Sequence, residues 1–156
     1  NEFKQIRSYI RIQHARFPQR FQPTFDIEPG VEAFYTMKLL LQPIVENAII
    51  HAFDRNDERN TLRISGAEQN GKIKLTVEDN GRGMSEEQVR RLLTTVQDEG
   101  GYGIRNVNER LKMLFGAEYG LQIESGVGLG TKVTVYLPMI ESEHQWRLLY
   151  ESHGHR

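Results

Sequence analysis

Two β-hairpins constrain the fold of this chain more than any other feature of its sequence. In the first, apolar residues alternate with polar ones between Leu62 and Val77, around the two-residue turn Asn70-Gly71. In the second, alternating segments flank a glycine-rich turn at 126–130. A doubly wound parallel sheet requires strict alternation of strands and helices, and two hairpins break that alternation. The sequence therefore predicts an α/β two-layer sandwich, in which a mixed, mostly antiparallel sheet carries helices on one face.

Helical patterns occupy most of the chain before and between these hairpins. Hydrophobic spacing predicts four helices: at 2–17, within 36–53, from the capping box of Ser85 and Gln88 to about residue 96, and from 104 to 115. A further strand is predicted at 21–27, which gives about five strands in total. Pro43 lies inside the second helical pattern, so that helix either starts late or is kinked.

Length and composition limit the classes of protein to which the chain can belong. Its 156 residues fit one domain with a short arm, and we divide them into a helical arm at 1–20, a central domain at 21–138 and a polar tail at 139–156. The absence of cysteine excludes disulfide scaffolds and zinc ribbons. A net charge of -1 gives no basic field for nucleic acids, and no apolar run is long enough to span a membrane. Because the chain begins with Asn1 and shows no signal-peptide pattern, we expect it to be part of a longer protein.

The first candidate functional residues lie on the apolar helix. Glu46, Asn47 and His51 are polar within an otherwise apolar stretch, and Asn47 and His51 share a helix face because they are four residues apart. An asparagine oxygen suits a magnesium ion that keeps its waters and binds substrate phosphates. The alternative is a helix edge that meets solvent.

The second candidate is the segment 79–84, Asp-Asn-Gly-Arg-Gly-Met, directly after the strand that ends near Val77. The carboxylate of Asp79 can accept a hydrogen bond from an amino group, and the two glycines let a flat ligand approach the backbone. Met84 offers a polarizable contact to a ring. These residues are also common in turns, so an ordinary turn is the alternative.

The third candidate is the glycine-rich segment 100–106, which leads straight into a helix. Free amides and the positive end of the helix dipole make an anion site there. Neither a Rossmann fingerprint nor a P-loop is present, because Asn106 stands where the third glycine of the fingerprint is required and no Gly-Lys-Ser/Thr segment occurs. An ordinary helix start remains the alternative. The fourth candidate, the turn from Gly128 to Thr131, is weak alone because hairpin turns need glycines anyway.

The order of these four segments resembles the nucleotide-binding domain shared by histidine kinases, DNA gyrase, heat-shock chaperones and mismatch-repair ATPases. Two longer stretches, LLLQPIVENA at 39–48 and GIRNVNERL at 103–111, are similar to sensor histidine kinases of the YesM and LytS type. The arm, with YIRIQ at 9–13 and RF at 16–17, looks like the stretch before the catalytic domain in that branch. The resemblance covers about residues 2–138.

The resemblance implies a Bergerat fold that binds ATP and Mg2+, with roles for residues at matching positions. Asn47 would be the magnesium ligand, with Glu46 in a supporting role, and Asp79 would read the adenine. Residues that shape or close the base pocket would be Gly81, Gly83, Met84 and Thr131. Residues that hold the phosphates, under a lid at 97–102, would be Gly101, Tyr102, Gly103, Ile104 and Arg105.

Two departures from the branch stand out. Ile50 occupies a position where the branch usually has a lysine, which leaves His51 or Arg105 as possible substitutes for that charge. The phospho-acceptor motif of the branch is also missing, and none of the five histidines has its context. The resemblance thus implies a catalytic domain whose arm leads from an absent acceptor domain.

By this resemblance the chain would transfer the γ-phosphoryl group of ATP to a histidine in a separate dimerisation domain, and from there to a response regulator. It would be the cytoplasmic domain of a membrane-anchored receptor. Two alternatives stay open: a degenerate ATP-binding regulatory module, which the Ile50 position makes conceivable, and a clamp-type ATPase of the same superfamily.

Overall fold

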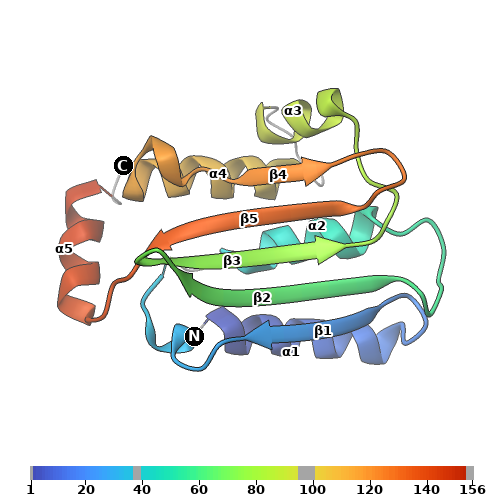
Figure 1. Ribbon diagram of the computed structural model, residues 1–156, viewed down its shortest axis with the longest axis horizontal. Coiled ribbons are helices and arrows are strands. Elements are labelled where there is room, and N and C mark those ends of the chain that lie inside the picture. Colours follow the sequence, from blue (N-terminus) through green and yellow to red (C-terminus); the bar gives the residue numbers. More distant parts are fainter. Residues whose placement is uncertain (1, 37–39, 95–100, 154–156) are drawn as a thin grey trace.

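The computed structural model describes residues 2–36, 40–94 and 101–153, which build a five-stranded sheet with helices packed on it (Figure 1). The strands are β1 (Gln22–Ile27), β2 (Thr61–Gln69), β3 (Lys72–Asp79), β4 (Gln122–Ser125) and β5 (Thr131–Pro138). Their order across the sheet is β1-β2-β3-β5-β4. Only the β1–β2 pair is parallel among these strands, so the sheet is mixed and mostly antiparallel.

Three long helices lie behind the sheet in Figure 1: α1 (Glu2–Arg16), α2 (Leu41–His51) and α4 (Gly101–Phe115). The shorter α3 (Glu86–Thr94) lies beyond the β4 edge, and α5 (Glu143–His153) lies at the end of the sheet opposite the tip of β3. Two 3-10 turns, Val31–Ala33 and Ala117–Tyr119, complete the described elements. This arrangement confirms the predicted two-layer α/β fold with helices on one face.

The hydrophobic core fills the space between these two layers. Alternate strand residues point toward the helices because side chains in a strand change face at every residue. The buried apolar side chains of the strands are those of Leu62, Ile64, Ile73, Leu75, Val77, Val133, Val135 and Leu137. They belong to one core with Ile44, Val45, Ile49, Ile104, Val107 and Leu111 from α2 and α4. Helix α1 contributes Phe3, Ile6 and Ile10 to the same core.

Two local sequence signals, a hairpin turn and a capping box, are confirmed by the structure. Asn70 (φ 53°) and Gly71 (φ 78°) make the turn between β2 and β3, a conformation that asparagine and glycine tolerate. The capping box is reciprocal: Ser85 N–H donates to Gln88 Oε1 (2.8 Å), and Gln88 N–H donates to Ser85 Oγ (3.2 Å).

Helix α2 starts late, at Leu41, which is one of the two outcomes that Pro43 predicted. Pro43 lies in the first turn, where a missing N–H costs nothing. One element differs from the prediction. The polar tail contains a fifth helix, α5, whose Trp146 ring lies 6.3 Å from the ring of Phe115. No helix among the described residues has the length and apolar character that a membrane crossing demands.

Candidate functional site

A cavity of about 720 Å³ opens between α2, α3 and the ends of β3 and β5. Its volume falls within the range of small-molecule sites in proteins, ~300–1,000 Å³. Its wall is formed by Ile44, Asn47, Ala48, His51, Ala52, Val77, Asp79, Arg82, Gly83, Met84, Gln88, Leu92, Val127, Thr131 and Val133. The wall therefore combines an apolar floor with a few polar groups, the composition expected for a site that orients a ligand.

Helix α2 supplies one polar side of this cavity. Asn47 and His51 both line it, as their four-residue spacing predicted. The side-chain amide of Asn47 makes no hydrogen bond with the part of the chain that the structure describes. His51 lies at the exposed mouth, where partial burial and the positive charge of Arg82 lower its pKa. The imidazole is therefore neutral at physiological pH and does not supply a fixed positive charge there.

Asp79, the last residue of β3, supplies the opposite polar group. Its side chain is 8% exposed and points to the helix face of the sheet, directly beside its cross-strand partner Thr131. Burial raises the pKa of this carboxyl, while backbone N–H groups of Gly81 (2.9 Å) and Thr131 act in the opposite direction. A desolvated carboxyl whose free lone pairs face a cavity is suited to accept a hydrogen bond from a bound ligand.

The raised pKa of Asp79 gives a stability prediction. At a pH below the ordinary aspartate pKa of 3.8, the carboxyl holds its proton whether or not the chain is folded. As the pH rises through the elevated folded-state pKa, the native carboxyl must ionise in a desolvated place, and stability falls. We therefore expect Asp79→Asn to be more stable than wild type at neutral pH, with the advantage shrinking toward pH 4. Urea unfolding of both proteins at several pH values measures this difference, and a difference independent of pH would contradict the prediction.

The loop after Asp79 is held against the hairpin between β4 and β5. The N–H of Gly128 donates to the carbonyl oxygen of Arg82 (2.7 Å), and Gly83 has a φ of 69°. A β-carbon on Gly83 would lie 1.9 Å from the carbonyl oxygen of Gly126. Only glycine permits this close approach, which brings the two loops together as one wall of the cavity.

We therefore expect Gly83→Ala to destabilise the protein by more than the ~1–2 kcal/mol that a left-handed backbone alone costs a non-glycine residue. Gly128→Ala is the matched control, because Gly128 has a similar φ of 80° in the same wall and open space around its β-carbon position. Urea midpoints of the two variants provide the comparison. Equal decreases in the urea midpoint would show that the backbone near Gly126 can shift to accept the added β-carbon.

Ser125 is a functional candidate that sequence reasoning missed. Its Oγ accepts from the N–H of Met84 (2.8 Å), donates to the carbonyl oxygen of Gly130 (2.9 Å) and lies 2.8 Å from Thr131 Oγ1. Because a carbonyl oxygen can only accept, the single proton of Ser125 goes to Gly130, and Thr131 must be the donor to Ser125. The oxygen of Thr131 is then left as an acceptor at the cavity wall. No pattern in the sequence distinguishes this serine from an ordinary strand-end residue.

The predicted site residues divide into two groups. Those that the structure brings together around the cavity are Asn47, His51, Asp79, Gly83, Met84 and Thr131. Outside the cavity wall are Glu46, whose carboxyl accepts from Gln42 Nε2 (3.0 Å), and Gly81, which packs on the backbone of Ala52. Of the lid expected at 97–102, residues 97–100 lie outside the described residues.

The glycine-rich segment also differs from its prediction. Gly101 is the first residue of α4, so Gly101, Tyr102 and Gly103 belong to the helix rather than to a loop before it. A β-carbon on Gly103 would lie 3.0 Å from Pro43, so this glycine lets α4 approach α2. The side chain of Ile104 is buried in the core, and that of Arg105 pairs with Glu109 (3.0 Å). Side chains of Ile104 and Arg105 therefore do not line the cavity.

Comparison with known proteins identifies the class to which this fold and cavity belong. Residues 36–141 match the family model described as Histidine kinase-, DNA gyrase B-, and HSP90-like ATPase. This match covers well over half of the chain, and the chain belongs to that family. A solved structure, the histidine kinase domain of the blue-light activated histidine kinase from Erythrobacter litoralis EL346, shares the fold with a TM-score of 0.61. The two are 20% identical, and the alignment covers 92% of this chain and 61% of that one.

Among individual proteins, the chain is similar to sensor kinases of one branch. It is 37% identical to Sensor protein LytS of Enterococcus faecalis over 152 residues, which are 94% of this chain and 26% of the relative. It is also 37% identical to Sensor histidine kinase YesM of Bacillus subtilis over 133 residues, 85% of this chain and 22% of the relative. The resemblance to the YesM and LytS branch is thereby confirmed. The chain spans about a quarter of the length of these curated relatives.

Proposed function

We propose that this chain is the catalytic ATP-binding domain of a two-component sensor histidine kinase. It binds magnesium-ATP in the cavity between α2 and the end of β3 and donates the γ-phosphoryl group to a histidine of a separate dimerisation domain. The observation that carries this proposal is the pairing of two polar groups across one cavity, Asp79 on β3 and Asn47 on α2. Membership of an ATPase family and the similarity to LytS and YesM proteins support the choice of nucleotide and of reaction.

The base of the nucleotide occupies the end of the cavity that holds Asp79. The carboxylate accepts a hydrogen bond from the adenine amino group, and the Thr131 oxygen offers a second acceptor beside it. Gly83 lets the loop backbone come close to the ring, and Met84 lies in the same wall. A guanine in this place would present a carbonyl oxygen to the carboxylate, so the site favours ATP over GTP.

The phosphates lie toward Asn47 and the first turn of α4. The residues present fit a magnesium ion, because Asn47 lines the cavity and its side-chain amide has no hydrogen-bond partner among the described residues. The ion would neutralise phosphate charge and orient the transferring group. The backbone N–H groups that open α4, a helix of 15 residues from Gly101, have no partner within the helix, and such groups favour anions. Phosphoryl transfer asks the protein mainly for this positioning and charge neutralisation.

The proposed partners follow from the similarity to sensor histidine kinases. The chain works with the histidine-containing dimerisation domain of the protein to which it belongs, and the phosphoryl group then passes to a response-regulator aspartate. The domain acts in the cytoplasm, below a membrane-anchored receptor. Neither nucleic acids nor lipids are part of the proposed reaction.

Transfer of radiolabel from γ-labelled ATP tests the proposal. The chain alone should bind magnesium-ATP and label itself negligibly, and added dimerisation domain should become labelled with the acid-labile, base-stable phosphate of phosphohistidine. Strong labelling of the chain alone would show that one of its own histidines is an acceptor. Tight binding without transfer would favour a degenerate regulatory module instead. One observation speaks for that second candidate: Ile50, where the branch usually has lysine, is 58% exposed and offers no charge to the phosphates. Ile50→Lys is then the variant to test for rescue.

A further inference from the structure

The segment that precedes the family match is attached to both ends of helix α2. We propose that residues 2–20 fix the position of α2 along its axis, with Glu2 and Arg20 as positioning residues for Asn47. This inference rests on the proposed function, because it assigns a role in nucleotide binding to residues that lie outside the matched range 36–141. The arm then supports the site and is not only a linker.

The first attachment is at the N-terminus of α2. Glu2 Oε1 accepts a hydrogen bond from the backbone N–H of Leu41 (3.3 Å), the first residue of α2. Glu2 is 9% exposed, which is unusual for a glutamate. The first N–H groups of a helix have no partner inside the helix, and an acidic side chain there also matches the positive end of the helix dipole. Glu2 therefore caps α2 from another helix, 39 residues away in the chain.

The second attachment is at the C-terminus of α2. Arg20 Nε and Nη2 donate to the carbonyl oxygen of Ile49 at 3.0 and 2.7 Å, and Nη2 also lies 3.4 Å from the carbonyl oxygen of Ile50. The last carbonyl groups of a helix lack partners within it, and a cation there matches the negative end of the dipole. The same segment thus places an acidic side chain at the N-terminus of α2 and a basic one at its C-terminus. Each charge is the one that the helix dipole favours at that end.

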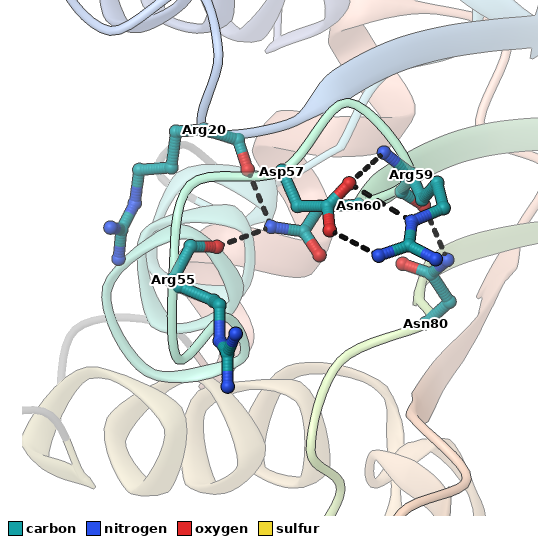
Figure 2. A network of polar contacts seen from close by, with 6 residues as sticks. All are labelled: Arg20, Arg55, Asp57, Arg59, Asn60 and Asn80. Atoms are coloured by element: carbon teal, nitrogen blue, oxygen red, sulfur yellow. Dashed lines mark hydrogen bonds and ion pairs between the residues drawn. The ribbon is translucent and has the colours of Figure 1, made fainter.

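The backbone of Arg20 is itself fixed by the network drawn in Figure 2. The Nδ2 group of Asn60 donates to the carbonyl oxygens of Arg20 and Arg55, both at 2.8 Å. Asn80, the residue after Asp79, donates from Nδ2 to the carbonyl oxygen of Arg59 (2.7 Å). The network lies at the start of β1, the start of β2 and the end of β3, so the Arg20 guanidinium ties α2 to this edge of the sheet.

Between the two attachments, α1 and α2 run side by side in the same direction (Figure 1). Phe3, Ile6 and Ile10 of α1 are buried in the core that α2 shares. Tyr9 of α1 is partly buried against the same core. The arm therefore contacts α2 at both ends and packs with it in between.

This arrangement has different consequences for the two ends of the nucleotide. Asn47 lies on α2, two residues before the carbonyl that Arg20 holds, and moves with that helix. Asp79 lies on β3 in the centre of the sheet, where β2 and β5 fix it on both sides. Loss of the Arg20 contact should therefore displace the magnesium ligand while leaving the adenine contact in place.

Calorimetry with adenosine and with magnesium-ATP separates these two ends. We expect Arg20→Met to weaken magnesium-ATP roughly tenfold and to leave adenosine within about twofold of wild type. The magnesium-ATP affinity of Arg20→Lys should lie between those of Arg20→Met and wild type, because lysine keeps the charge and can still donate a hydrogen bond. Arg63→Met is the matched control, because Arg63 pairs with Asp26 (2.6 Å) on the sheet face away from α2. A merely structural role for Arg20 would weaken adenosine and magnesium-ATP by the same factor, and that result would overturn the inference.

Hydrogen exchange on the empty protein tests the attachment without any nucleotide. Arg20→Met and Glu2→Ala should accelerate exchange along α2 at least about fivefold more than along α4, whereas Arg63→Met should not distinguish the two helices. Equal acceleration of both helices would overturn the inference. If wild-type protein bound ATP equally with and without magnesium, the proposed function would fail, and the exchange result would still decide whether the arm positions α2.

Discussion

Replacing Asn47 by alanine is expected to reduce phosphoryl transfer to an added dimerisation domain by at least ~100-fold. Asn47 lines the cavity from α2, and its side-chain amide makes no hydrogen bond with the described residues. If Asn47 holds a magnesium ion as proposed, removal of its amide oxygen takes away that hold, and such an ion is worth several kcal/mol of charge stabilisation in phosphoryl transfer. Adenosine has no phosphate, so its affinity should remain within about twofold of wild type.

The measurement is the initial rate of radiolabel transfer at saturating ATP, together with adenosine binding by calorimetry. Asn56→Ala is the matched control, because Asn56 is an exposed asparagine outside the cavity. Transfer by Asn47→Ala at the rate of the control would remove Asn47 from the reaction. A parallel loss of adenosine binding would instead show that the substitution had collapsed the cavity.

The sequence predicted the sheet and the two polar groups of the cavity because their signals are local. Alternation and the Asn70-Gly71 turn set the register of β2 and β3, and that register carries Asp79 to a strand end beside Thr131. The four-residue spacing of Asn47 and His51 is enough to place both on one side of α2. Periodicity therefore located these residues without knowledge of the tertiary structure.

The contacts that support the cavity were not predictable in this way, because they join distant parts of the chain. Ser125 meets Met84 across 41 residues, and Arg20 reaches Ile49 across 29. Neither serine nor arginine carries a local signature for such a contact, since both are common on surfaces. Only the packed fold, in which the last hairpin lies on the loop after Asp79 and the arm lies on α2, makes them partners.

The predicted start of α4 was wrong, and α5 was not predicted, for a related reason. Glycines at 101 and 103 disfavour a helix by propensity, so the sequence predicts a loop there, whereas α4 begins at Gly101. Tertiary packing overrides this low helix propensity. A β-carbon on Gly103 would lie 3.0 Å from Pro43, so glycine at this position lets α4 pack closely on α2. The tail helix α5 was missed because its apolar face is short, with Trp146 as its large anchor on Phe115. Helix propensity therefore predicts a helix poorly where a single tertiary contact stabilises it.

Replacing Asp79 by alanine is expected to weaken ATP binding about 10- to 150-fold and to remove most of the preference for ATP over GTP. The magnitude is that of the proposed charge-assisted hydrogen bond, ~1.5–3 kcal/mol, which the carboxylate would accept from the adenine amino group. The carboxyl is 8% exposed, so water cannot easily replace the lost partner. Calorimetry with ATP and GTP measures both effects, and Asp26→Ala is the matched control, because Asp26 is an exposed carboxylate paired with Arg63 away from the cavity. Equal wild-type affinities for ATP and GTP, or an Asp79→Ala variant that binds like Asp26→Ala, would show that Asp79 does not read the base.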